Sequence, residues 1–390
     1  MELKISDGIR YIGVDDKDID LFESQYVVPN GVSYNSYLIM DEKIAVMDTV
    51  DKRGQKEWEQ KLMRELDGKT PDYLVISHLE PDHAGSIARL MEMFPDITLV
   101  SNAKTFSMLP QFFNAPAEDK TVTVKEGDTL SLGTHTLKFF MAPMVHWPEV
   151  MVTYEESEKT LFSADGFGKF GALDTDEDWA CEARRYYFNI CGKYGMPVQA
   201  LLKKAATLDI QRICPLHGPI LEENLEYYIN LYNTWSSYTP ENKGVLIAYA
   251  SIHGNTRKAA EKLAELIRAK GEEKVVVSDL AREDMAEVIE DAFRYDRMVL
   301  AAASYDASVF PCMQTFLSKL QVKAYQKRTV GILENGSWAP TAAKTMKAML
   351  EPMRDITLLE PVVTIKSTLK DENMADMEAL ADAVYKAGNK

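Results

Sequence analysis

Cysteine and positive charge are both scarce in this chain of 390 residues. Its four cysteines include no C-x-x-C pair, which argues against a disulfide framework and against a cysteine-ligated iron or zinc site such as a rubredoxin module. The formal net charge is -16, so neither nucleic acid nor an anionic membrane is expected as a partner. The acidic surface fits two interpretations, simple solubility or attraction of a basic partner protein.

Long apolar runs are lacking as well. No segment approaches the roughly 18 consecutive apolar residues that a membrane helix needs. Residues 1–13 do not combine a basic stretch with an apolar one, so no signal peptide is predicted. We therefore expect a cytoplasmic protein.

The rhythm of strands and helices predicts two domains, residues 1–242 and 243–390. The first domain mixes short apolar strands with helices, as in a layered α/β fold. Its strands are expected at 34–39, 44–48, 73–77, 137–141, 160–164 and 211–215, and its helices at 55–66, 87–94, 182–191 and 198–208. The polar segment 236–244 is the best candidate for a linker.

After this segment, strands and helices alternate strictly. Strands are expected at 245–249, 274–278, 298–302, 329–333 and 357–365, and helices begin near 256, 285, 313, 342 and 373. Five strands that alternate with helices predict a doubly wound parallel sheet.

Histidine is rare, yet two of the six histidines stand in one ten-residue stretch, SHLEPDHAGS. It contains His78, Glu80, Asp82 and His83 and directly follows the expected strand 73–77. Strand ends are where α/β folds present their site residues. Imidazoles and carboxylates at this spacing can converge on two adjacent cations.

Three more candidate ligands follow other apolar strands, in PMVHWPE, FSADGFG and CPLHGPI. These are His146, Asp165 and His217, and Asp165 is the natural bridge between two metals. Oxygen and nitrogen ligands without thiolate favour iron or manganese over structural zinc. A single histidine would be interpreted as an ordinary polar side chain, but the whole set predicts a two-metal site.

At these residues the sequence resembles the metallo-β-lactamase superfamily, whose motif is H-x-H-x-D-H. Glu80 stands where that motif has its second histidine, and this replacement is typical of flavodiiron proteins, which the YNSYLI stretch at 34–39 also resembles. An anionic oxygen ligand stabilises higher-valent iron better than imidazole does.

The resemblance implies an N-terminal αβ/βα sandwich that holds two iron ions. One iron would take His78, Glu80 and His146, and the other Asp82, His217 and in some members His83, with Asp165 as the bridge. Tyr194, in GKYGMPV, resembles a tyrosine near the open coordination positions of the irons; the alternative is a tyrosine that only packs.

The first strand of the second domain leads into a phosphate-binding pattern, VLIAYASIHGNT. A strand ends there, a small-residue loop follows, and a helix begins whose free N–H groups suit a phosphate. No P-loop lysine and no GxGxxG accompany it, which disfavours a nucleoside triphosphate or a dinucleotide. The loop residues are Ser251, Ile252, His253, Gly254, Asn255 and Thr256. A plain helix cap is the alternative.

This pattern resembles the flavodoxins, which bind FMN with this loop and two others. The other two would be SYDASVF after the third strand, with Ser304, Tyr305 and Asp306, and ENGSW after the fourth, with Glu334, Asn335, Gly336, Ser337 and Trp338. Tyr305 and Trp338 could flank the isoalloxazine ring, although Trp338 could also be structural. Asp306 stands where family members often have an amide, so it either shifts the flavin potential or points to water.

Joining the two halves, the resemblance implies an enzyme that passes electrons from FMN to a diiron site and reduces dioxygen to water, nitric oxide to nitrous oxide, or both. It also implies a head-to-tail homodimer, or a dimer of dimers, and an external electron donor such as a rubredoxin, a flavin reductase or a reduced deazaflavin. Two other functions are alternatives. One is a dizinc hydrolase with an accessory flavodoxin domain, which Glu80 argues against; the other is an electron carrier or redox sensor with a vestigial metal site, which the complete ligand set argues against.

Overall fold

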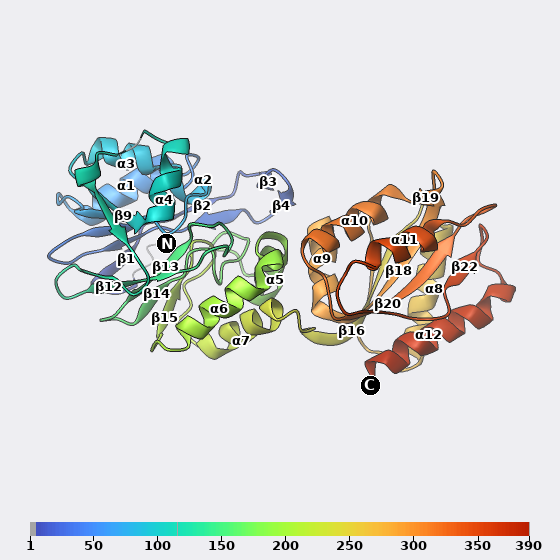
Figure 1. Cartoon of the computed structure of the whole chain (residues 1–390). Helices are drawn as coiled ribbons and strands as arrows, with labels where there is room; N and C mark the ends of the chain where they lie inside the picture. Colours follow the sequence, from blue (N-terminus) through green and yellow to red (C-terminus); the bar gives the residue numbers. More distant parts are fainter. Residues whose placement is uncertain (1–4, 115, 390) are drawn as a thin grey trace. The chain divides into compact units, whose positions relative to one another are not determined.

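The computed structural model describes residues 5–114 and 116–389 (Figure 1). The chain divides into two compact units, of which unit 1 comprises Met1–Tyr187 and Met196–Asn233, and unit 2 comprises Phe188–Gly195 and Thr234–Lys390. The domain boundary expected between residues 242 and 243 stays a prediction.

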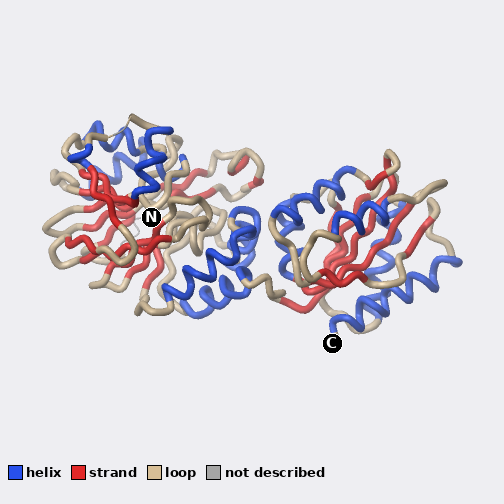
Figure 2. The backbone as a smooth tube through the Cα atoms, viewed as in Figure 1, coloured by secondary structure: helices blue, strands red, loops and turns tan. Residues whose placement is uncertain are grey.

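Unit 1 is built from two sheets with helices on their outer faces (Figure 2). The first sheet has the order β1 (Ile9–Tyr11), β6 (Tyr37–Ile39), β7 (Ala45–Met47), β8 (Tyr73–Val75), β9 (Thr98–Asn102), β10 (Thr121–Val124). The second has the order β11 (Thr129–Ser131), β12 (Thr136–Met141), β13 (Met151–Glu155), β14 (Thr160–Phe162), β15 (Arg212–Cys214). Two ribbons pair β2 (Val14–Asp16) with β5 (Val32–Tyr34) and β3 (Leu21–Phe22) with β4 (Tyr26–Val27).

The helices of this part of the chain are mostly short. They are α1 (Gln55–Leu66), α2 (Pro81–Ala84), α3 (Ile87–Met93), α4 (Ala103–Met108), η1 (Leu109–Gln111), η2 (Glu118–Lys120), α5 (Trp179–Ile190), η3 (Gly192–Tyr194), α6 (Gly195–Ala205) and α7 (Leu225–Ser236). By the division above, α5, α6 and α7 each cross from one unit into the other.

The core of unit 1 lies between its two sheets. Side chains alternate along β12, so that Leu137 and Phe139 join Met47 and Val75 of the first sheet in one buried cluster. The neighbouring side chain, Phe140, belongs to the opposite face of the second sheet. This alternation gives the second sheet two apolar faces, one toward the first sheet and one toward helices.

Unit 2 contains a sheet with the order β17 (Val275–Asp279), β16 (Asn242–Ala250), β18 (Tyr295–Tyr305), β20 (Arg328–Asn335), β21 (Ile356–Leu358). β22 (Val363–Ile365) also pairs with β20, and the short β19 (Ser308–Val309) is antiparallel to β18. The helices are α8 (Asn255–Ala269), α9 (Met285–Arg294), α10 (Pro311–Val322), α11 (Ala342–Leu350), η4 (Asp371–Asn373) and α12 (Met374–Gly388). The parallel order 2-1-3-4-5 is that of the flavodoxin-like fold. Within the described residues, no helix is long and apolar enough to cross a bilayer.

Several element boundaries differ from those expected from the sequence. The strand expected at 34–39 is two strands, β5 and β6, and the one expected at 357–365 is β21 and β22, with Pro361 between them. The helix α7 was not predicted, because its many aromatic and asparagine residues have low helix propensity. Part of the expected linker is regular structure, since α7 ends at Ser236 and β16 begins at Asn242.

One histidine outside the expected metal site joins three turns of unit 1. His135 lies between Asp41, whose Oδ2 is 2.8 Å from the ring Nδ1, and Glu158, whose Oε1 is 3.3 Å from Nε2. Burial lowers the pKa of His135, but its hydrogen bonds with both carboxylates outweigh burial and raise the pKa above its usual value.

Candidate metal centre and flavin site

Four of the expected ligands form one group at the edge of the sheets of unit 1. His78 follows β8, Glu80 precedes α2, His146 lies between β12 and β13, and Asp165 follows β14. One ligand atom from each lies within 4.8 Å of the others. Glu80 Oε2 is 3.2 Å from His78 Nε2 and 3.0 Å from His146 Nε2. This group can surround a single cation.

The other three ligands form a second group beside the first. His217 Nε2 lies 3.2 Å from Asp82 Oδ2 and 3.1 Å from His83 Nε2. Asp165 reaches both groups, because its Oδ2 is 3.0 Å from His146 Nε2 and its Oδ1 is 3.2 Å from His83 Nε2. The structure thus brings all seven expected ligands together, while their roles at a metal stay predictions.

Strand register explains why ligands far apart in the sequence meet. β14 and β15 are parallel with Phe162 opposite Cys214, and Asp165 and His217 each come three residues later. Ala164, directly before Asp165, has a left-handed backbone with φ 50°. Such strained conformations concentrate at functional sites, where the surrounding structure holds them in place.

Two groups outside the ligand set orient the imidazoles. His78 Nδ1 lies 2.8 Å from Glu149 Oε1, which also accepts from the Leu79 N–H at 2.9 Å. His217 Nδ1 lies 2.7 Å from the carbonyl oxygen of Ser33. Both contacts direct Nε2 of the ring into the site, as in other metal-binding histidines. Neither contact was predicted; Glu149 lies only three residues after His146, but a lone glutamate there carries no distinctive signal.

The electrostatics of the site favour cations. Burial lowers the pKa of His146, but hydrogen bonds with Asp165 and Glu80 outweigh it and raise the pKa to about 9. Burial and nearby carboxylates oppose each other in the same way at His78, whose pKa is raised well above its usual value. Burial raises the pKa of Asp165, but the adjacent histidines hold it well below its usual range. The carboxylates therefore hold protons on the imidazoles, in the places that metal ions would take.

A further carboxyl next to this group was also not predicted. Glu23 lies in the turn between β3 and β4, where burial and the negative charge of Glu80 raise its pKa to about 7. A carboxyl with this pKa holds its proton part of the time at neutral pH.

The donor set fits a pair of metal ions. Both carboxylate oxygens of Asp82 and Oδ1 of Asp165 are buried and have no hydrogen-bond partner among the described residues, and Nε2 atoms of His83 and His217 face them. Buried carboxylate oxygens without a donor suit a bound cation. Carboxylate oxygens and imidazole nitrogens without sulfur are the ligands of iron and manganese.

The expected FMN loops of unit 2 line one pocket. Its free space is about 1450 Å³, with the open part included. The predicted residues that line it are Ser251, Ile252, His253, Asn255, Thr256, Ser304, Tyr305, Asp306, Asn335, Gly336, Ser337 and Trp338. Ala303, Ala307, Ala339, Thr341 and Ser367 also line it and were not predicted.

Two features of this pocket fit a flavin mononucleotide. Gly254, with φ 86°, directly precedes α8, and no atom lies within 4 Å of the place where its side chain would be, so the helix N-terminus is open to a phosphate. Trp338 is 91% exposed and Tyr305 46% exposed. Aromatic side chains this exposed at the rim of a pocket suit a stacked ring system.

Two predicted site residues lie elsewhere. Glu334 does not line the pocket; its carboxylate accepts from the Ala343 N–H at 2.9 Å and from Thr364 Oγ1 at 2.9 Å. Tyr194 is half-buried in η3 and belongs to unit 2, whereas the metal ligands belong to unit 1, so its expected role at the irons stays a prediction.

Comparison with known proteins identifies both domains. The family model "ODP family beta lactamase" matches residues 32–218, and a flavodoxin domain matches residues 246–362. The fold is similar to that of rubredoxin oxygen:oxidoreductase from Desulfovibrio gigas, with 26% identity and a TM-score of 0.91 over 100% of this chain and 99% of that one. It is also similar to the flavodiiron protein from Giardia intestinalis, with 24% identity and a TM-score of 0.91 over 99% and 97%. The chain belongs to the flavodiiron protein family.

Two relatives align with most of the length of this chain. An uncharacterized protein of Methanocaldococcus jannaschii is 29% identical over 381 residues, which are 96% of this chain and 95% of that protein. The anaerobic nitric oxide reductase flavorubredoxin of Escherichia coli is 29% identical over 364 residues, or 90% and 75%. The expected fold, a lactamase-like domain followed by a flavodoxin-like one, is confirmed. The protein is an oxidoreductase with FMN and a pair of iron ions as cofactors.

Proposed function

We propose that this flavodiiron protein reduces dioxygen to water, nitric oxide to nitrous oxide, or both, with electrons that pass from FMN to the iron pair. The observation that carries the proposal is Glu80, a carboxylate among the imidazoles of the first ligand group, beside an Asp165 that reaches both groups. Oxygen-rich ligation of paired ions suits redox chemistry with a small gas better than hydrolysis.

When bound, FMN supplies electrons and the iron pair binds and reduces the gas. The chain's residues hold and isolate the site. Asp165 spans the two ligand groups, and Glu149 holds the His78 ring so that Nε2 faces inward. Glu23 adds a further carboxyl next to Glu80, at the turn between β3 and β4. The buried setting of these groups limits escape of partly reduced oxygen species.

We propose a separate electron donor to FMN, such as a rubredoxin, a flavin reductase or a reduced deazaflavin. The names of the relatives from Desulfovibrio gigas and Escherichia coli support a rubredoxin-type donor. A head-to-tail homodimer, or a dimer of dimers, in the cytoplasm completes the proposal, with the domain boundary between residues 242 and 243.

The test is an anaerobic assay of protein loaded with ferrous iron and FMN, with a reduced artificial donor and either gas. We expect turnover of at least one gas. Glu80→Ala should lose iron and activity while it keeps FMN, and Glu92→Ala, an exposed glutamate on α3, should behave like the wild type. Purified protein that holds zinc, reduces neither gas and hydrolyses a β-lactam or a thioester would overturn the proposal.

A further inference from the structure

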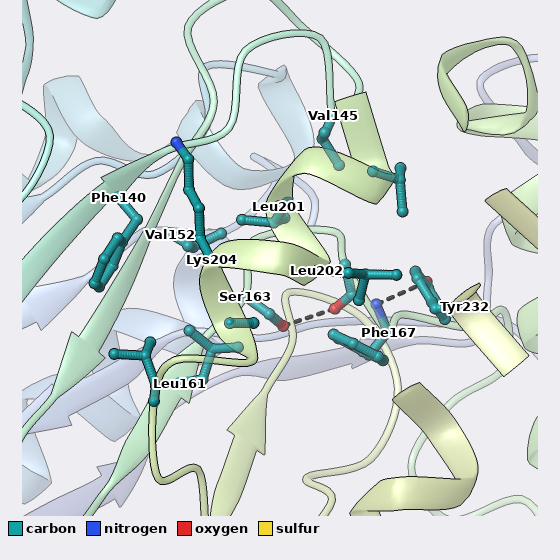
Figure 3. A pocket seen from close by; sticks show the side chains of 14 residues that line it. Phe140, Val145, Val152, Leu161, Ser163, Phe167, Leu201, Leu202, Lys204 and Tyr232 are labelled. Atoms are coloured by element: carbon teal, nitrogen blue, oxygen red, sulfur yellow. Dashed lines mark hydrogen bonds between the residues drawn. The ribbon is translucent and has the colours of Figure 1, made fainter. Parts of the chain in front are cut away.

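Unit 1 contains a cavity between helix α6 and the second sheet, which we call the α6 cavity (Figure 3). Phe140, Val152 and Leu161 line it from β12, β13 and β14, and side chains of α6 line it from the opposite side. Its free space is about 480 Å³, with the open part included. Most of this space is open, and the enclosed part has room for about one small molecule.

The polar side chains of its lining all take part in hydrogen bonds. Ser163 Oγ donates to the Gly166 carbonyl at 2.6 Å, and Tyr232 Oη accepts from the Phe167 N–H at 2.7 Å (Figure 3). Lys204 Nζ donates to the carbonyl at the end of β12 at 2.8 Å. A buried water needs two to four polar partners, and an apolar cavity without them stays dry.

The inner wall of the α6 cavity belongs to the segments that carry metal ligands. Val145 directly precedes His146, and Ser163 and Gly166 stand on either side of Asp165 in one tight turn. The cavity therefore borders the two loops that carry His146 and Asp165.

The outer wall is more open. Leu201, Leu202 and Ala205, near the end of α6, are only partly buried, whereas Val198 is 2% exposed. These side chains are therefore the part of the lining nearest to solvent.

We propose that the α6 cavity binds an uncharged diatomic gas, dioxygen or nitric oxide, and supplies it to the metal centre from within unit 1. This inference rests on the proposed function. Such gases offer almost no hydrogen bonding, so they lose little when they leave water, and dry apolar cavities are known to take up xenon and benzene. Ions and polar molecules would lose their hydration without finding a partner in this lining.

Xenon is the probe for the binding step. Crystals of the iron- and FMN-loaded protein under xenon pressure should show xenon among Phe140, Val152 and Leu201. Ala205→Leu, which fills the cavity, should lose it, whereas Ala206→Leu, at the exposed next position, should keep it. If Ala205→Leu does not fold, Val198→Phe is the second test variant, because it fills the same space from another turn of α6.

Steady-state rates test the supply step. We expect the filled variant to raise the KM for the gas several-fold with kcat at saturating gas unchanged, and Ala206→Leu to match the wild type. An empty cavity under xenon overturns the proposal, and so does an unchanged KM in a filled variant that has lost xenon. If the iron- and FMN-loaded protein binds xenon in the cavity but reduces neither gas, the cavity is supported as a gas-binding site and the proposed function is overturned.

Discussion

The substitution Glu149→Gln tests whether the carboxylate that orients the His78 ring contributes to iron binding. The buried Glu149 Oε1 lies 2.8 Å from His78 Nδ1 and accepts from the Leu79 N–H at 2.9 Å, while Oε2 has no hydrogen-bond partner among the described residues. Glutamine keeps an acceptor at Oε1 but loses the charge, and bonds to a charged acceptor are about twice as strong as neutral ones. Its amide N–H₂ would also be buried without a partner, which costs about 1–3 kcal/mol of folding stability.

Loss of such an outer carboxylate typically weakens metal binding by about 10–100-fold, which corresponds to roughly 1.4–2.7 kcal/mol. We therefore expect iron affinity, measured by competition with a chromophoric chelator, to fall within that range while FMN content is unchanged. Glu155→Gln is the matched control, because Glu155 is equally buried and accepts two backbone N–H groups, from Ser157 and Glu158, away from the ligands. It should lower stability without changing iron affinity. Equal iron affinities in wild type and Glu149→Gln would refute the reasoning.

Three other predictions follow from the same structure. The pKa of His146 is about 9 without metal, and iron needs the neutral imidazole, so iron affinity of the metal-free protein should rise with pH up to about 9; calorimetric titrations that release no protons at neutral pH would contradict this. The folded-state pKa of His135 is raised, so its contribution to stability should be complete below its unfolded value of about 6.5 and disappear as pH rises through the folded value. Denaturation of His135→Gln should thus show a larger deficit at about pH 6 than at about pH 9, and a deficit that grows with pH would disprove this sign. Thr256→Val should weaken FMN binding by about 1 kcal/mol, measured by flavin fluorescence, whereas Thr345→Val, outside the pocket, should leave it unchanged.

The sequence pointed to the seven candidate ligands because histidine is rare and these histidines stand with carboxylates in loops that follow apolar strands. It could not reveal Glu149 or Ser33, because their contacts depend on how loops far apart in the chain are brought together. Glu23 lies in a two-strand ribbon too short to predict from periodicity.

The flavin pocket shows the same limit. Its three loops were predicted from the ends of expected strands. Ser367 also lines the pocket, but it follows β22, which the sequence pattern predicted as one strand with β21. Glu334 was expected among the FMN contacts because it begins ENGSW. In the structure it still belongs to β20, and its side chain caps α11 instead. Asn335, the next residue of the same strand, does line the pocket, so the alternation of side chains along β20 decides which of the two faces it.

The ligands of the metal centre come from the ends of both sheets of unit 1, and the last of them, His217, follows the final strand, β15. During synthesis from the N-terminus, the first sheet and most of the second emerge before that strand can pair with β14. With His217 as a ligand, the ligand set is complete only after β15 has paired with β14, so we expect iron to bind late in the maturation of this domain.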